Sequence, residues 1–351
     1  MRNSRARLIL DVDTGTDDAG ALLMASTFPG LMLEAALATW GNCSRDRAAR
    51  NTLAILEAAG RTDVPVYRGC DRPRGPTAVV DGAEMVMGRD GLGEVDVADP
   101  DGSPTSEPAA SALVRMTAES PGHLTLIALA PLTTLAAALD LDPSLPGRLH
   151  QLIVMGGAIR VAGNSTPAAE ANIGHDPEAA AKVIRAFGSP GALASGHLPQ
   201  LVPLDVTLPS ALTAAELDAL RASPLPGADL LHRIWQAVWP SGRLETGRDD
   251  VWPAHDLLAS WCVVDPLVCQ WSAVPLDVDT GGSAAWGATV ADLRVVRWPG
   301  RQTAASGATW DIALGVDTAR FHAGVRAWLS GRADTEGLPE ALSEPARAAD
   351  P

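Results

Sequence analysis

The chain has 351 residues, of which 46% are hydrophobic and 20% are charged, a composition typical of a globular protein with a large core. The formal net charge of -15 argues against general binding to nucleic acids or anionic membranes, because contacts to phosphate need clustered lysine and arginine. The sequence contains no run of about 18 apolar residues, so no membrane span is predicted.

The cysteines and the amino-terminal residues predict the compartment. Cys43, Cys70, Cys262 and Cys269 form no Cys-x-x-Cys pair, which favours reduced thiols over a disulfide framework or a zinc site. The apolar run at 8–10 is too short to be the core of a signal peptide. We therefore expect a cytoplasmic protein.

Short apolar runs alternate with helix-like stretches through the first two-thirds of the chain. Strands are predicted at 8–10, 31–39, 64–67, 124–130 and 151–155. Helices are predicted at 18–27, from a cap at Ser44 to about Ala59, and at 106–119, 132–139 and 177–187. Residues 68–105 and 156–176 are predicted loops. This alternation predicts βαβ units and a parallel sheet.

The last third begins with an apolar stretch at 201–206 and then changes pattern. Helices are predicted at 213–222, 228–238, 254–264 and 318–329, a loop at 240–253, and a hairpin from 286–298 and 309–316. We see no internal repeat and no linker-like segment. The fold class expected is therefore a single α/β domain, residues 1–335, with a central, mostly parallel sheet flanked by helices. The tail, 336–351, is expected to fray.

Four carboxylates follow the first predicted strand within eight residues. Asp11 and Asp13 lie two apart, so they point the same way at an extended strand end, and Asp17 and Asp18 stand where a helix begins. One or two aspartates would be ordinary turn or capping residues. Four like charges need neutralisation, and a hard divalent cation that prefers oxygen ligands is the simplest candidate.

Two other known kinds of acidic site are alternative interpretations of this cluster. An EF-hand loop fails, because the twelfth position counted from Asp11 is Leu22 rather than glutamate. A magnesium-dependent phosphatase of the haloacid dehalogenase type also begins with a strand and Asp-x-Asp, and would use Asp11 as the nucleophile. That type needs a later lysine to neutralise the phosphate. The only lysine, Lys182, lies on the predicted helix 177–187, which is a poor place for that role.

Further polar motifs join the first one. Residues 40–42 read WGN, 155–158 MGGA, 163–172 GNSTPAAEAN, 176–180 DPEAA and 255–256 HD. With the opening aspartates, this set resembles the inosine-uridine preferring nucleoside hydrolase family from about residue 7 to residue 330. The combination of the aspartate cluster with the Gly-Asn and Glu-x-Asn loop is specific, whereas His-Asp alone is weak.

The resemblance implies a fold, a reaction and a cofactor. The family hydrolyses the N-glycosidic bond of ribonucleosides to ribose and free base and uses a bound calcium ion. By resemblance, Asp13, Asp18, Asp256 and the backbone carbonyl of Leu129 hold Ca²⁺, which suits a flexible shell of oxygens. Asp13 is then the general base that activates a calcium-bound water.

The remaining site residues are also assigned by the resemblance. His255 assists the departing base as an acid, and Asn42 orients the water or the sugar. The substrate contacts implied are Asp17, Asn164, Glu170, Asn172 and Asp256, with Met155 under the ribose, and Asp11 supports the cluster. The family's dimers and tetramers make a homo-oligomer the expectation for quaternary structure.

Several of these residues have simpler interpretations when taken singly. His255 would be a packed residue at a helix start, Met155 a core methionine, and the loop asparagines solvated. Trp235 and Trp239 lie four apart on a predicted helix, which favours a core or rim stripe over stacking on a base. A non-catalytic ribose or nucleoside binder remains an alternative, although the intact Asp13 argues against it.

Three segments depart from the family pattern. Residues 87–93 read MGRDGLG, where the family often has histidine in place of Met87. Leu129 stands where the family has threonine, but only the backbone carbonyl is needed there. Ala171 stands where the family usually has phenylalanine. These changes leave the aspartate cluster and the base in place, and they leave the preferred nucleobase open.

Overall fold

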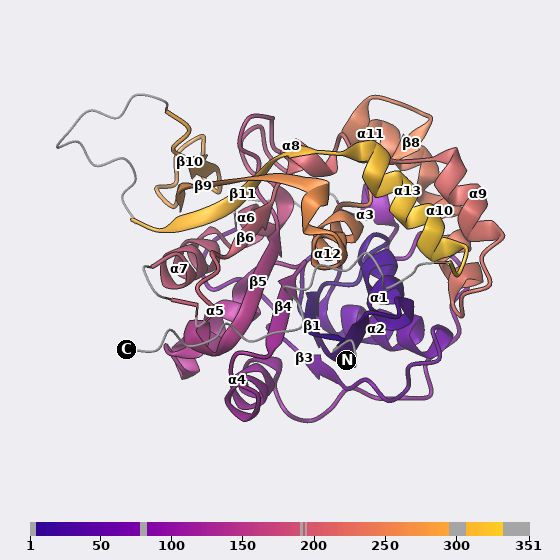
Figure 1. The fold of residues 1–351 in the computed structure, drawn as a ribbon, viewed down its shortest axis with the longest axis horizontal. Helices are drawn as coiled ribbons and strands as arrows, with labels where there is room; N and C mark the ends of the chain where they lie inside the picture. Colours follow the sequence, from indigo (N-terminus) through magenta and orange to yellow (C-terminus); the bar gives the residue numbers. More distant parts are fainter. Residues whose placement is uncertain (1–4, 78–82, 190–191, 194, 295–306, 333–351) are drawn as a thin grey trace.

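The computed structural model describes residues 5–77, 83–189, 192–193, 195–294 and 307–332. Its centre is a nine-stranded sheet in the order β10-β9-β11-β6-β5-β4-β1-β2-β3 (Figure 1). The strands are β1 (Ala6–Val12), β2 (Leu31–Ala38), β3 (Val66–Arg68), β4 (Leu124–Ala128), β5 (Leu149–Met155), β6 (Gln200–Val202), β9 (Cys269–Val278), β10 (Thr289–Ala291) and β11 (Thr309–Val316). A separate antiparallel pair joins β7 (Leu212–Thr213) to β8 (Val251–Trp252).

Helices cover both faces of the sheet. They are α1 (Asp18–Thr27), α2 (Arg45–Ala58), α3 (Ala83–Met87), α4 (Ala109–Glu119), α5 (Thr133–Leu141), α6 (Ala171–His175), α7 (Pro177–Phe187), α8 (Leu204–Thr207), α9 (Ala214–Arg221), α10 (Ala228–Val238), α11 (Gly242–Thr246), α12 (His255–Val264) and α13 (Thr318–Leu329). Three 3-10 turns are η1 (Leu145–Arg148), η2 (Trp239–Ser241) and η3 (Pro266–Val268). None of the helices in the described ranges is long and apolar enough to cross a membrane.

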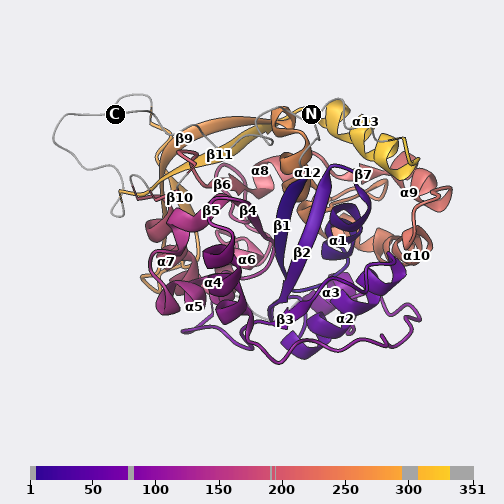
Figure 2. The same ribbon diagram turned by 60° about the horizontal axis from the view of Figure 1, so that its bottom comes forward.

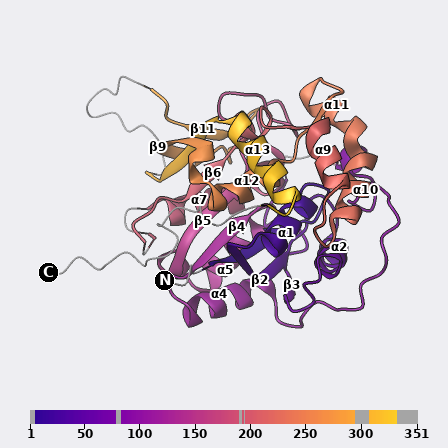
Figure 3. The same ribbon diagram turned by 45° about the vertical axis from the view of Figure 1, so that its right-hand side comes forward.

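The layers explain why the central strands are apolar throughout. Helices α4, α5 and α7 lie on one side of the sheet and α1, α2 and α12 on the other (Figure 2). All five residues of β4 are buried, as expected for a parallel strand covered on both faces. Helices α9, α10, α11 and α13 gather at the end of the molecule beyond α1 (Figure 3).

The order in which successive strands join the sheet reverses at β1. Strands β2 and β3 lie on one side of β1, and β4, β5 and β6 follow in order on the other, all parallel to their neighbours. Open α/β sheets bind ligands at the carboxyl ends of their strands at such a switch point. Asp11 lies at the carboxyl end of β1, Asp13, Asp17 and Asp18 follow it, and Leu129 follows the end of β4.

The single α/β domain with a mostly parallel sheet is confirmed, and helices α1, α7 and α13 begin and end where predicted. The predicted hairpin is wrong: β10 and β11 each pair with β9, and β11 also pairs with β6. The prediction missed β9 because Pro275 and Asp277 interrupt its apolar pattern; proline is tolerated there near the sheet edge. Residues 295–298 of the predicted hairpin and the tail 336–351 lie outside the described residues.

Smaller differences concern short elements inside predicted loops. The segments 68–105, 156–176 and 240–253 contain α3, α6 and α11, each of five residues. The stretch 201–206 is divided, because β6 ends at Val202 and α8 begins after Pro203. Ser44 stands at the predicted cap position of α2, but its side chain makes no capping hydrogen bond.

Candidate active site

All four opening aspartates are buried where β1 ends and α1 begins. Asp17 occupies the N-cap position of α1, and Asp18 is the first helical residue. The Asp18 carboxylate accepts hydrogen bonds from the backbone N–H of Gly15 at 2.8 Å and of Asp13 at 3.3 Å. Asp18 thus closes the turn around its own backbone and brings Asp13 to the same side.

Asn42 holds Asp13 by both carboxylate oxygens. Its backbone N–H donates to Asp13 Oδ2 at 2.7 Å, and its side-chain Nδ2 donates to Asp13 Oδ1 at 3.1 Å. The neighbouring Gly41 leaves no room for a side chain, because a Cβ there would lie 1.9 Å from Asp13 Oδ2. The pairing of Asp13 with Asn42 therefore depends on a close backbone approach.

Helix α12 adds a fifth aspartate from the far end of the chain. Asp17, Asp18 and Asp256 each present a carboxylate oxygen within 4.8 Å of the others, the one such trio of potential metal ligands in the described part of the chain. Asp17 Oδ1 and Asp256 Oδ2 are buried without a hydrogen-bond partner. Unpartnered, buried oxygens on neighbouring carboxylates fit a hard divalent cation. Asp13 contacts Asp18 and lies beside this trio.

Burial and mutual repulsion oppose ionisation of the cluster. Burial, followed by the charge of Asp18, raises the pKa of Asp13 well above its ordinary value, and burial with the charges of Asp17 and Asp18 does the same to the pKa of Asp256. Burial and the charge of Asp17 raise the pKa of Asp18 to about 7. Burial raises the pKa of Asp11 to about 7 as well, although Thr39 donates to it. A positive charge at the cluster would reverse these shifts.

Asn172 connects the ends of β4 and β5. Its side-chain Nδ2 donates to the carbonyl oxygens of Leu129 at 2.8 Å and of Met155 at 3.2 Å, and it contacts Met155 Sδ at 3.4 Å. The backbone N–H of Leu129 in turn donates to the carbonyl of Asp11. Three predicted site residues therefore meet beside β1.

Glu170 caps helix α6 and anchors the polar loop before it. Its carboxylate accepts from the backbone N–H groups of Asn172 and Gly157, both at 2.8 Å, and of Ile173 at 3.2 Å. Asn164 is exposed, and its side-chain oxygen accepts from the Ala171 N–H at 3.0 Å. The loop that carries Asn164 and Glu170 is thus ordered by its own side chains.

His255 is buried at the start of α12, and both ring nitrogens have partners. Nδ1 lies 2.7 Å from Thr207 Oγ1, and Nε2 lies 3.0 Å from Glu245 Oε2. Burial alone would lower the pKa of His255, but the charge and hydrogen bond of Glu245, with the charges of Asp17 and Glu170, raise it above its ordinary value. The ring is therefore set up to carry a proton.

Sequence reasoning did not find Thr207 or Glu245. Thr207 follows the apolar stretch 201–206, and Glu245 lies in the charged segment 240–253 predicted as a loop, so neither carried a periodic or motif signal. Trp235 is fully buried and donates from Nε1 to the carbonyl of Thr16 at 2.9 Å, which places it in the core. Met87 lies against the turn: a Cβ at Gly15 would be 2.5 Å from Met87 Sδ.

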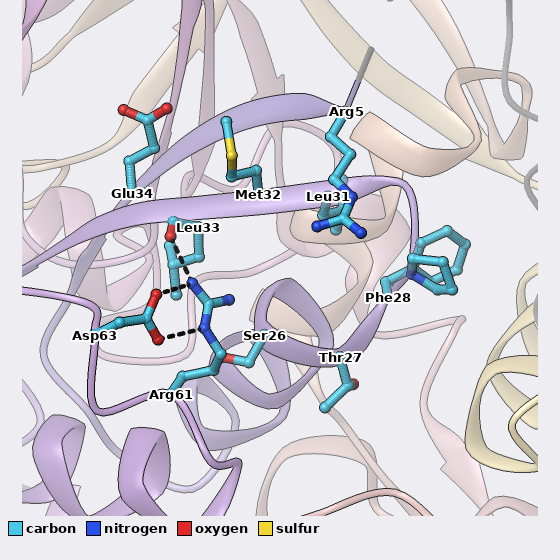
Figure 4. A pocket seen from close by; sticks show the side chains of 11 residues that line it. Arg5, Ser26, Thr27, Phe28, Leu31, Met32, Leu33, Glu34, Arg61 and Asp63 are labelled. Atoms are coloured by element: carbon cyan, nitrogen blue, oxygen red, sulfur yellow. Dashed lines mark hydrogen bonds and ion pairs between the residues drawn. The ribbon is translucent and has the colours of Figure 1, made fainter. Parts of the chain in front are cut away.

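A cavity of about 630 Å³ lies elsewhere, at the amino end of β2 (Figure 4). Arg61 at its wall donates to Asp63 Oδ1 at 2.8 Å and to the carbonyl of Leu33 at 3.2 Å. The guanidinium charge is thus compensated within the protein. The aspartate cluster lies at the carboxyl ends of the strands, so it is separated from this cavity by the length of the sheet.

Comparison with known proteins gives consistent similarities. The family described as inosine-uridine preferring nucleoside hydrolase matches residues 8–323. The chain is 33% identical to a probable uridine nucleosidase 2 of Oryza sativa subsp. japonica over 83% of each chain. It is 32% identical to a pyrimidine-specific ribonucleoside hydrolase of an Enterobacter species, over 81% of this chain and 87% of that one. A solved plant nucleoside hydrolase superposes with a TM-score of 0.84 and 30% identity, covering 93% of this chain and 99% of the other.

Proposed function

This chain belongs to the inosine-uridine preferring nucleoside hydrolase family and hydrolyses ribonucleosides to ribose and free base, and we propose that Asp13 is its general base and His255 its general acid. The observation that supports this assignment is the buried aspartate cluster at the switch point of the sheet, with His255 next to Asp256 on α12. In glycoside hydrolysis, one group activates the water that attacks the sugar carbon, and another protonates the leaving group on the other side of the scissile bond.

We propose that the cluster holds Ca²⁺. The residues that would bind it are Asp13, Asp18, Asp256 and the Leu129 carbonyl, and Asp17 lies close enough to share in the shell. Support comes from an all-oxygen donor set with unpartnered, buried atoms, which a flexible calcium shell accommodates. When bound, the ion supplies positive charge that favours the ionised aspartates, acidifies a nearby water and orients sugar hydroxyls.

The residues of the chain then divide the remaining work. Asp13, fixed by the two N–H donors of Asn42, receives a proton from the attacking water. Asn172 has its amide nitrogen committed to backbone carbonyls, which leaves its amide oxygen to accept from a ribose hydroxyl. Asp17 would hold a second ribose hydroxyl, and Asn164 and Glu170 the 5′-hydroxyl side. Met155, whose Sδ lies 3.4 Å from Asn172 Nδ2, would pack under the ribose. Asp11 supports the strand end.

Uridine is the substrate proposed first. The relatives named above are described as acting on uridine or on pyrimidine ribonucleosides, and they align over most of this chain. The test is incubation of the purified protein with uridine, cytidine, inosine, adenosine and guanosine, with free base and reducing sugar followed together. Equal release of base and sugar is expected, fastest from uridine. No release from any of the five by protein with confirmed bound metal would overturn the proposal.

Two further measurements separate the alternatives: phosphate release from phosphate esters and nucleoside binding by an Asp13→Ala variant. A phosphatase using Asp11 would release phosphate from phosphate esters and form an aspartyl phosphate. A binding protein would keep its affinity for nucleosides after Asp13→Ala, whereas the proposed enzyme loses turnover by orders of magnitude.

We also propose a cytoplasmic location and a homo-oligomeric state. The four free cysteines support a reducing compartment, and the family resemblance supports the oligomer. Cell fractionation and light scattering after size-exclusion chromatography test these two statements.

A further inference from the structure

Glu245 is a largely buried carboxylate to which the proposed reaction assigns no role. It lies on α11, and its side chain is 15% exposed. Its Oε2 lies 3.0 Å from His255 Nε2 and 3.5 Å from Asn164 Nδ2. One carboxylate oxygen is therefore held between the buried start of α12 and the exposed part of the loop that carries Asn164.

The short helix is held firmly enough to place this side chain. Gly242 starts α11 where a Cβ would lie 2.3 Å from the carbonyl of Val251, so the helix packs directly on β8. Thr246 Oγ1 donates to the carbonyl of Gly242 at 2.7 Å, and Gly247 ends the helix with a φ of +70°, a conformation that glycine adopts without strain. Glu245 is thus presented from a defined turn of backbone.

The two residues already proposed for the 5′-hydroxyl side use their oxygens within the protein. The side-chain oxygen of Asn164 accepts from the Ala171 N–H at 3.0 Å, and its side-chain nitrogen donates to Glu245. The carboxylate of Glu170 accepts one backbone N–H at Oε1 and two at Oε2. Neither residue is left with a side-chain oxygen that lacks a donor.

Glu245 differs from them because its second oxygen is unpaired. Among the residues that the structure describes, Oε1 has no hydrogen-bond partner and is not closed off from solvent. Because Oε2 is held by two neighbours, the carboxylate has a set position and Oε1 has a defined place. A fixed carboxylate oxygen without a partner suits a hydroxyl donor on a bound ligand.

The ribose of a nucleoside carries one hydroxyl that fits this place. The 2′- and 3′-hydroxyls share one edge of the ring, where Asp17 and the proposed calcium ligands would hold them. The 5′-hydroxyl stands on a carbon outside the ring, and Asn164, the neighbour of Glu245, belongs to the loop proposed for that side. We propose that Glu245 Oε1 accepts a hydrogen bond from the 5′-hydroxyl and so selects substrates that carry it. This contact rests on the proposed function, in which Asn164 and Glu170 face the 5′ side.

The test removes the hydroxyl from the substrate and the acceptor from the protein. Wild type, Glu245→Gln and Glu245→Ala are assayed on uridine, on 5′-deoxyuridine, which lacks the hydroxyl, and on N3-methyluridine, which lacks the N–H of the base. Loss of the 5′-hydroxyl should lower kcat/KM of the wild type by roughly 10- to 150-fold, the range for a hydrogen bond to a charged group. In Glu245→Ala the same change of substrate should cost at least about fivefold less than in wild type.

Glu245→Gln separates the proposed contact from the support that Glu245 gives to its neighbours. The glutamine amide oxygen can take the place of Oε2 beside His255 and Asn164, whereas the amide nitrogen then stands where Oε1 stood and cannot accept. This variant should lose several-fold on uridine and stay near wild type on 5′-deoxyuridine. A loss that acts through His255 lowers both substrates alike and cancels in the comparison.

Asp249→Asn is the matched control. Asp249 lies in the same segment and is an exposed partner of Arg243, so its replacement should leave all three substrates unaffected. Metal content and melting temperature are measured for every variant.

Three results would contradict the contact in different ways. If removal of the 5′-hydroxyl costs wild type and both Glu245 variants the same factor, Glu245 does not touch that hydroxyl and the proposal is overturned. If the variants differ from wild type in the effect of N3-methylation instead, Glu245 contacts the base, which also overturns it. If metal-loaded wild type cleaves none of the three substrates, the proposed function itself is refuted, and this contact with it.

Discussion

Replacement of Gly41 by alanine should disable the site although it replaces none of the functional side chains. The added Cβ would lie 1.9 Å from Asp13 Oδ2 and 2.8 Å from Pro131 Cδ, so the Asp13 carboxylate would have to move by roughly 1 Å. The same movement weakens both hydrogen bonds from Asn42. Misplacement of a reacting group by about 1 Å can cost about 100-fold in rate, which corresponds to about 2.7 kcal/mol of transition-state stabilisation.

The assay is kcat/KM on uridine, with metal content and melting temperature recorded for each protein. Gly147→Ala is the matched control, since the nearest atom to a Cβ there is the Ala192 carbonyl oxygen at 3.7 Å, an ordinary contact. A folded, metal-loaded Gly41→Ala protein with kcat/KM within twofold of wild type would refute the reasoning, because Asp13 would then tolerate displacement or play no part.

Three further outcomes are expected. Asp18→Asn should lower the bound-metal content, read by elemental analysis, and kcat/KM by at least about 100-fold, and full metal occupancy would contradict the assignment of Asp18 as a ligand. In chelator, the raised pKa values of Asp11 and Asp18, both about 7, mean that the folded state binds more protons than the unfolded state between pH 4 and 7. Metal-free protein should therefore lose stability as pH rises through that window, on the order of 1.4 kcal/mol per pH unit for each group, and a flat or rising urea midpoint from pH 5 to 7 would disagree. Trp235→Ala should destabilise the fold by about 3–5 kcal/mol in urea unfolding, because Trp235 is fully buried against Gly20 and Trp252; unchanged stability with a raised KM would instead indicate base stacking.

The parts of the site that could be predicted are those fixed by local chain geometry. The opening aspartates follow one strand and enter one helix, so the turn that gathers them is determined by a few consecutive residues. The helices with strong caps and regular apolar spacing, such as α7, were also found at their true limits. Family resemblance then supplied Asp256 and His255, which no spacing in the first segment could indicate.

The parts that escaped prediction are fixed by packing between distant segments. Glu245 reaches His255 only because α11 lies on β8, and the charged sequence around it reads as solvated loop. Strand β9 was missed because Pro275 and Asp277 break its alternation, although pairing with both β10 and β11 satisfies its backbone. In each case, tertiary contact outweighed the local pattern.

The aspartate cluster also bears on the order in which the molecule can be assembled. Asp11, Asp13, Asp17 and Asp18 emerge together early in synthesis, whereas Asp256 and His255 on α12 emerge more than two hundred residues later. Until α12 docks on α1, the junction after β1 is an incomplete group of like charges whose dehydration is unfavourable. Such distant pairings form slowly, since a long stretch of chain must first be brought together. The aspartates should therefore lose most of their hydration only when the last third of the chain arrives, and a nascent amino-terminal half should stay more hydrated there than the finished protein.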